Sequence, residues 1–177
     1  MKLSLKPILI AVAALVAVVL AVVAVIFFIP RDNTSFSFEC FRLRAQVADF
    51  LRDVENERYD DAFSRIACRD AGGRPVESSA ELQKIWTDRV SALRTEDNTY
   101  LNDHSSLKVR KENGEFTVTV TLSVLRQGYN DPFYSKGTTL TVVDEDGWKI
   151  VSVSEYEPAL QTPLEKALSG YFADGRE

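Results

Sequence analysis

Histidine is almost absent from this 177-residue chain, and the single one, His104, limits the chemistry that the chain can support. A metal site built on two imidazoles is excluded, and any Ser–His–Asp triad would have to include His104. This residue lies in the polar stretch 102–106, where adjacent side chains of an extended segment point to opposite faces. A glycine-rich loop that could cradle a phosphate is missing too. We therefore predict a loop histidine, no catalytic residues, no metal and no cofactor.

The chain also lacks an excess of positive charge. It has 21 basic and 26 acidic residues, and Lys2 and Lys6 both precede residue 8. Residues 31–177 therefore carry 19 basic and 26 acidic side chains, a formal charge of −7. An acidic domain is a poor partner for nucleic acid or anionic lipid headgroups through bulk electrostatics. We expect no nucleic-acid partner.

Residues 8–29 contain no charge, no hydroxyl and no glycine. A helix of 22 residues is about 33 Å long, which exceeds the roughly 30 Å hydrocarbon core of a bilayer. Lys2 and Lys6 favour a cytoplasmic N-terminus. The pattern predicts a cytoplasmic segment 1–7, an uncleaved transmembrane signal anchor at 8–29 and a single-pass protein of the cell membrane with its C-terminal domain outside. A cleaved signal peptide is the alternative, although its only small-residue site, at 22–24, lies inside the apolar run.

Cysteine is scarce, with Cys40 and Cys68 as the two examples. An even number in an exported domain predicts a disulfide, here Cys40–Cys68. Helical periodicity at 43–54 and 59–66 predicts two antiparallel helices, which would bring the start of the first near the end of the second. Two separate buried thiols are the alternative.

The remaining chain divides into helices followed by strands. Residues 30–39 form a polar tether that contains Phe36 and Phe38, and the third predicted helix begins at a capping box of Ser78 and Glu81. After residue 95 the apolar period changes from 3.6 to 2. The predicted strands cover about 107–111, 116–124, 138–143 and 148–156, with a tight turn at Asn113–Gly114.

Thr162, Pro163 and Glu165 predict one more helix within residues 158–177. Its apolar side would either complete the core or bind a partner. The expected fold class is α+β, with an N-terminal transmembrane helix, three helices packed on a curved antiparallel sheet, and a C-terminal helix.

Two segments carry a resemblance to a known family. The strand start Asp146-Gly147-Trp148-Lys149-Ile150 and the segment Glu57-Arg58-Tyr59-Asp60-Asp61-Ala62-Phe63 resemble the nuclear-transport-factor-2-like (cystatin-like) superfamily. The chain is similar in particular to exported, membrane-tethered actinobacterial members such as the mammalian-cell-entry (Mce) associated proteins. The resemblance covers about residues 40–157. It implies a cone-shaped sheet whose apolar interior serves some members as a pocket, whereas many other members are interaction modules.

Two groups of aromatic residues are candidates for binding. A ligand pocket inside the cone would be lined by Trp86, Phe116 and Trp148. The connection at 128–137 carries Tyr129, Phe133 and Tyr134, and aromatic residues are enriched where partners dock. The alternative for Phe133 and Tyr134 is that they fold back and plug the open end of the sheet.

Taken together, these features predict a non-catalytic, membrane-anchored extracytoplasmic interaction module. We expect an accessory subunit of a cell-envelope complex, with the lipid bilayer and an envelope protein as its partners. A binding protein for an apolar small molecule or lipid is the alternative. A hydrolase or isomerase is the third hypothesis, for which the remaining carboxylate and phenol candidates are Asp97, Asp103, Glu155 and Tyr156.

Overall fold

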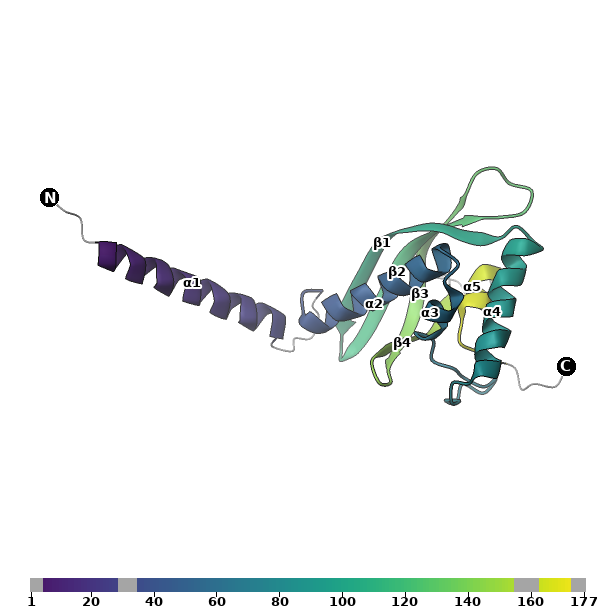
Figure 1. Cartoon of the computed structure of the whole chain (residues 1–177), viewed down its shortest axis with the longest axis horizontal. Helices are drawn as coiled ribbons and strands as arrows, with labels where there is room; N and C mark the ends of the chain where they lie inside the picture. The colour runs from purple at the N-terminus through teal and green to yellow at the C-terminus, as the bar shows by residue number, and fades with distance from the viewer. Residues whose placement is uncertain (1–4, 29–34, 155–162, 173–177) are drawn as a thin grey trace.

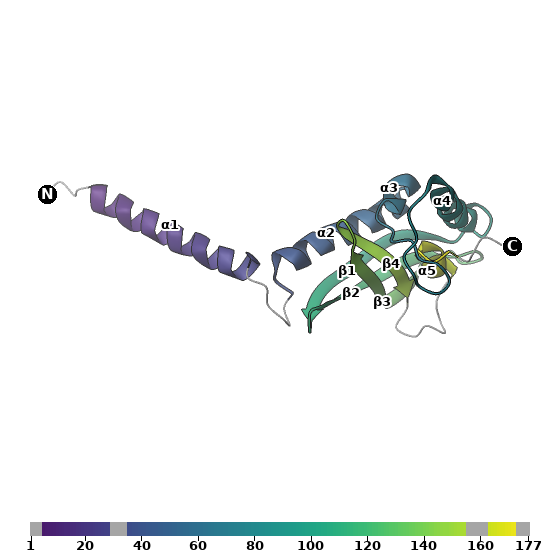
Figure 2. The same cartoon turned by 90° about the horizontal axis from the view of Figure 1, so that it is seen from below.

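The computed structural model describes residues 5–28, 35–154 and 163–172 (Figure 1). These residues form an α+β fold with an antiparallel sheet of strand order β1-β2-β3-β4. In chain order the elements are α1 Leu5–Phe28, α2 Phe38–Glu55, α3 Tyr59–Phe63, α4 Ala80–Thr95, β1 Tyr100–Glu112, β2 Glu115–Leu125, β3 Phe133–Asp144, β4 Trp148–Ser154 and α5 Pro163–Leu168. Figure 2 shows α2, α3 and α4 on the same side of the sheet. The predicted fold class is confirmed at this level.

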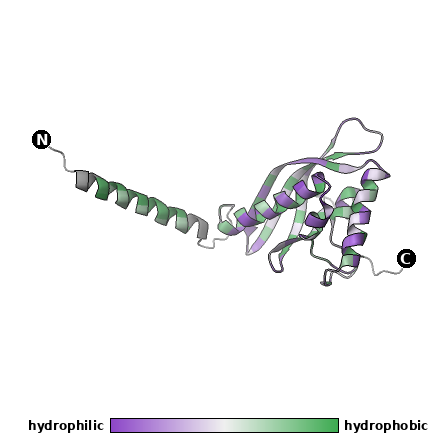
Figure 3. Ribbon diagram, viewed as in Figure 1, coloured by the Kyte–Doolittle hydropathy of each residue, from purple (hydrophilic) through white to green (hydrophobic). Residues whose placement is uncertain are grey.

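α1 extends away from the rest of the molecule and is apolar on all sides (Figure 3). Its described side chains run from residue 9 to residue 25 and are all exposed. Over the described residues, no helix is both long enough and apolar enough to qualify as a membrane span. The transmembrane anchor at 8–29 therefore stays a prediction.

α2 is an amphipathic helix that packs mainly against β1. Its first turn is capped by Ser37, whose Oγ accepts a hydrogen bond from the amide of Cys40 at 3.1 Å. The predicted apolar stripe is buried, and its members are Leu43, Val47, Phe50, Leu51 and Val54. The stripe forms the centre of a core that continues onto the inward-facing residues of β2.

A buried carboxylate fixes the turn between α2 and α3. Asp53 is almost fully buried, and Arg58 and Arg65 each approach one of its oxygens at 2.5 Å. Removing a charge from water is costly unless it is paired and hydrogen-bonded. The two arginines satisfy this requirement and hold α3 against the end of α2.

α4 and α5 close the end of the domain that lies away from α1. Ser79, rather than the predicted Ser78, caps α4, because the Ser79 Oγ accepts from the Leu82 amide at 3.2 Å. Leu164 and Leu168 of α5 are fully buried, so the terminal helix completes the core. Thr162 of the predicted second capping box lies outside the described residues. Arg89 of α4 donates to the carbonyls of residues 167, 169 and 171, and so joins the two helices.

β1 is longer than the sequence predicts, since it begins at Tyr100 instead of residue 107. It is an edge strand, and bulges between Leu101 and Asp103 and between Ser105 and Lys108 interrupt its alternation. Polar residues on such an edge remain solvated, so the alternating pattern is lost there. The predicted tight turn is confirmed, with φ of 52° at Asn113 and 84° at Gly114.

The predicted Cys40–Cys68 disulfide is wrong: both cysteines are buried in the core, and no disulfide joins them within the described residues. Cys40 lies beside β1, since neighbouring Glu39 accepts from the Nζ of Lys111 at 2.9 Å. Cys68 follows a segment paired with the outer edge of β4, where the Ala67 amide donates to the Ile150 carbonyl. The prediction assumed a short second helix that continues to the neighbourhood of Cys68, whereas α3 ends at Phe63.

Candidate functional site

The structure brings together two of the three predicted pocket residues. The rings of Phe116 and Trp148 meet edge to face, with centroids 4.7 Å apart. Trp86 is fully buried elsewhere, with ring centroids 6.4 Å from Phe50 and 5.9 Å from Phe63. A side chain enclosed in this way cannot line an open pocket, so a ligand site shared by all three residues is not formed.

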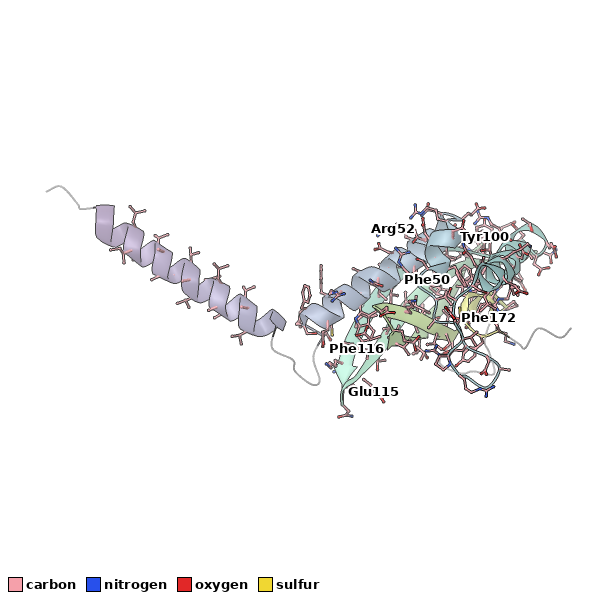
Figure 4. The ribbon with its side chains drawn as sticks, turned by 60° about the horizontal axis from the view of Figure 1, so that its bottom comes forward. Phe50, Arg52, Tyr100, Glu115, Phe116 and Phe172 are labelled. Atoms are coloured by element: carbon pink, nitrogen blue, oxygen red, sulfur yellow. The ribbon has the colours of Figure 1, made fainter. Side chains whose placement is uncertain are left out.

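Phe116 and Trp148 instead line an open groove of about 520 Å³ along β2 and β3. Its other lining residues are Gly114, Glu115, Thr117, Val143, Asp144 and 139–142. Figure 4 shows Glu115 at the tip of the β1–β2 hairpin with Phe116 beside it. The groove is lined by two aromatic rings and by hydroxyl groups. Such a mixed lining suits a surface contact or an amphipathic ligand better than it suits a wholly apolar ligand.

A second groove of about 520 Å³ shares Thr117 with the first and lies between the start of α2 and β1. Its lining residues are Ser35, Phe36, Arg44, Val109, Glu112, Thr119, Lys108 and Arg110. Three basic side chains thus meet one carboxylate, Glu112, which pairs with Arg110 at 3.1 Å. The groove can therefore receive an anionic group.

His104 lies within β1 instead of in a loop, so the predicted loop histidine is wrong. Its Nδ1 contacts the Glu55 carboxylate at the end of α2, and its amide donates to the Asp103 side chain at 2.8 Å. Both partners are largely shielded from solvent. The three side chains offer ligand atoms within 4.8 Å of one another. They are the described residues best placed to hold a divalent cation, and without one they join α2 to β1.

Glu165 is a fully buried carboxylate under β3. Its Oε1 accepts from the hydroxyls of Ser135 at 2.9 Å and Thr138 at 3.0 Å. These bonds compensate for part of the cost of burial and dock α5 on the sheet. The other carboxylates named as enzyme candidates do not converge here, and residues 155 and 156 lie outside the described part of the chain.

The predicted partner-contact residues lie at the start of β3 and in the connection before it. Phe133 pairs with Val124 and Tyr134 with Ser123, so both belong to the strand. Tyr129, Phe133 and Tyr134 are all exposed, and the idea that the last two plug the sheet is therefore wrong. The guanidinium of Arg126 covers the Phe133 ring at 4.0 Å.

Burial shifts the pKa of three groups that support this architecture. Burial raises the pKa of the Cys68 thiol and, together with nearby Glu57, that of the Tyr59 phenol. Burial also lowers the pKa of Arg89, whose charge is nevertheless stabilised by the three carbonyls it contacts. These are positions that hold the fold.

Sequence reasoning missed the residues around the second groove. Arg44 of α2 and Lys108 and Arg110 of β1 come from two elements that are distant in sequence. One signal existed, because Phe36 interrupts an otherwise polar tether directly before α2. No local pattern, however, shows that this phenylalanine meets the basic side of β1.

Comparison with known proteins gives no match, so the site is interpreted from its geometry alone. The resemblance noted in the sequence stays a prediction, and the chain is assigned to no family. No protein-family model, no curated protein and no solved structure matches it.

Proposed function

We propose that this protein is a single-pass, membrane-anchored extracytoplasmic interaction module that serves as an accessory subunit of a cell-envelope complex. The anchor is residues 8–29, an apolar stretch that extends on both sides beyond the described side chains of α1. Lys2 and Lys6 support a cytoplasmic N-terminus under the positive-inside rule. The resemblance to exported, membrane-tethered proteins supports the same arrangement.

One observation carries the proposed docking of a partner: the exposed aromatic hairpin, defined as Tyr129, Phe133 and Tyr134. Tyr129 is 70% exposed and Tyr134 is 56% exposed, although both could bury large apolar areas. Figure 1 places the β2–β3 connection at the end of the domain away from α1. Tyrosine contributes apolar area and a hydroxyl at low entropic cost, which explains its enrichment at protein interfaces.

The clustered polar side chains are already held in structural contacts, which supports a non-catalytic role. Among the described residues, His104 contacts Glu55, Asp53 is held by two arginines, and Glu165 accepts from two hydroxyls. Each of these contacts joins secondary-structure elements. A candidate base or nucleophile would have to be released from such a contact before it could act.

The test is site-specific photocrosslinking of the full chain in its own membrane. A photoreactive residue at Tyr129 should capture one defined envelope protein. The same residue at exposed Thr117, which lines both grooves on the sheet, serves as the matched control and should not capture that protein. Tyr134→Ala should reduce the Tyr129 crosslink about tenfold, the factor expected for losing one interface aromatic. Recovery of only this chain, or equal capture at both positions, would show that the hairpin is not the docking site.

Binding of an apolar small molecule is the second candidate, and the groove of Phe116 and Trp148 favours it. Two partly buried aromatic rings that line a groove of about 520 Å³ could hold one acyl chain or ring system. Native mass spectrometry of the same purified chain separates the candidates. A bound molecule lost on Trp148→Ala would support this second function, whereas an empty chain would count against it.

A further inference from the structure

The start of α2 exposes aromatic residues close to the end of α1. Phe36 is 74% exposed and Phe41 is 62% exposed, and Phe38 is exposed as well. Phe38 and Phe41 are three residues apart in α2, so they share one face of the helix. Three phenylalanines at one end of an acidic domain are a large apolar surface to leave in contact with water.

Basic residues predominate around this aromatic surface, which also includes the exposed carboxylate of Glu39. The guanidinium of Arg42 lies 5.9 Å from the Phe38 ring centre, and Arg44 lines the second groove together with Lys108 and Arg110. Among the described residues, no carboxylate pairs with Arg44 or Lys108, whereas Arg110 pairs with Glu112. The domain as a whole is acidic, with a formal charge of −7 over residues 31–177. This end is therefore a local exception to the charge of the domain.

The short connection between α1 and α2 keeps this aromatic surface close to the apolar stretch. α1 ends at Phe28 and the next described residue is Ser35. Seven residue steps span roughly 25 Å at full extension, so Ser35, directly before Phe36, stays within that distance of the end of α1. Figures 1 and 2 both place the start of α2 and the β1–β2 hairpin at the α1 end of the domain.

We propose that the proximal surface, defined as Phe36, Phe38, Phe41, Arg42, Arg44, Lys108 and Arg110, docks the domain onto the anionic phospholipid headgroups of the bilayer that holds α1. This inference rests on the proposed membrane anchor. The aromatic rings enter the interfacial layer, and the basic side chains bind lipid phosphates. Each basic residue near an anionic membrane strengthens the contact about fivefold. The domain then lies on the membrane with its distal aromatic hairpin directed away from it.

The test uses the full chain reconstituted in vesicles whose acyl chains carry bromine, which quenches nearby tryptophan. Phe41→Trp reports the proximal surface, and Tyr129→Trp is the matched control at the far end. Both variants retain Trp86 and Trp148, so the emission of the unmodified chain is subtracted from each. In vesicles containing phosphatidylglycerol, we expect the added Phe41→Trp emission to fall at least about twofold. The Tyr129→Trp emission should be unchanged.

Two further measurements separate the possible failures. The double variant Arg44→Ser with Lys108→Ser should lose most of the quenching at Phe41→Trp, and so should vesicles of phosphatidylcholine alone. Flotation of the chain with the vesicles reports the anchor independently of docking. A chain that floats but shows equal emission changes at both tryptophans would overturn the docking and leave the anchor intact. A chain that does not float would overturn both proposals.

Discussion

The two ends of the α+β domain both expose aromatic residues, but in different surroundings. At the α1 end the rings are phenylalanines, and exposed arginine and lysine side chains lie beside them. At the far end two of the three rings are tyrosines, in a connection that also carries Asp131 and Lys136. Phenylalanine with basic residues suits a lipid interface, whereas tyrosine with mixed charge suits a protein. The difference indicates that one domain can present separate surfaces to a membrane and to a partner.

This comparison requires that the exposed aromatic residues at both ends contribute little to folding. We expect Trp86→Ala to lower the free energy of unfolding by about 3–5 kcal/mol, because the ring is fully buried between Phe50 and Phe63. Phe41→Ala should change it by less than about 0.5 kcal/mol, since the ring is exposed. Chemical denaturation of the full chain in detergent, followed by circular dichroism, measures both values. If Phe41→Ala were as destabilising as Trp86→Ala, the proximal rings would belong to the core.

The far end also depends on a backbone contact that leaves no room for a side chain. A Cβ at Gly170 would lie 2.3 Å from the carbonyl oxygen of Ala67. Gly170→Ala should therefore lower the free energy of unfolding by about 2–3 kcal/mol, because the terminal segment must move away from residues 66 and 67. Gly72→Ala is the control and should cost less than about 1 kcal/mol, since a Cβ there lies 3.3 Å from the Asp70 carboxylate and close to no backbone atom. Equal effects in thermal unfolding would contradict the tight closure of this end.

A smaller effect on the free energy of unfolding is expected at alkaline pH, where the buried thiol of Cys68 titrates. Burial raises the pKa of Cys68 above the ordinary 9.0, so the folded state retains its proton to higher pH than the unfolded state does. The stability gained in this way is complete below about pH 9 and is lost as pH rises through the folded pKa. Cys68→Ala should flatten the fall in unfolding free energy just above pH 9. An unchanged slope would assign the fall to Tyr59, whose pKa is also raised.

Reducing agent provides a control for that measurement. Because no disulfide joins Cys40 to Cys68 within the described chain, reductant should leave the unfolding midpoint unchanged. Both thiols should react with alkylating agents only after unfolding, since both are buried. A lower midpoint on reduction would restore the disulfide that the sequence predicts.

The elements with a clear period were predictable from the sequence. α2 and β2 show it best, because each packs one uninterrupted apolar face on the core. The first seven residues of β1 were not predictable, since two bulges and the positive φ of Ser106 break the alternation. The short α3 was predicted too long. Its continuation pairs with β4 instead, and that pairing is a tertiary contact that no local pattern reports.

The candidate surfaces were predictable where their residues are close in sequence. Tyr129, Phe133 and Tyr134 fall within six residues of one another, so composition alone singled them out. The proximal surface joins α2 to residues about 65 positions later. The groove shared by Arg44 and Lys108 and the pairing of Glu39 with Lys111 show that proximity, which is a tertiary contact. Trp86 failed as a pocket residue because a tryptophan on an amphipathic helix looks the same whether it lines a cavity or fills one.

The bulged edge of β1 has a consequence for how copies of the chain meet. A membrane confines proteins to two dimensions, where sheet edges at the same height collide often. β4 is protected because the segment at Ile66 occupies its outer edge. β1 is exposed, but its two bulges and the charged residues along it prevent a flat, continuous ladder with a second chain. The bulges that made the first half of β1 unpredictable from the sequence therefore also protect the protein from edge-to-edge aggregation.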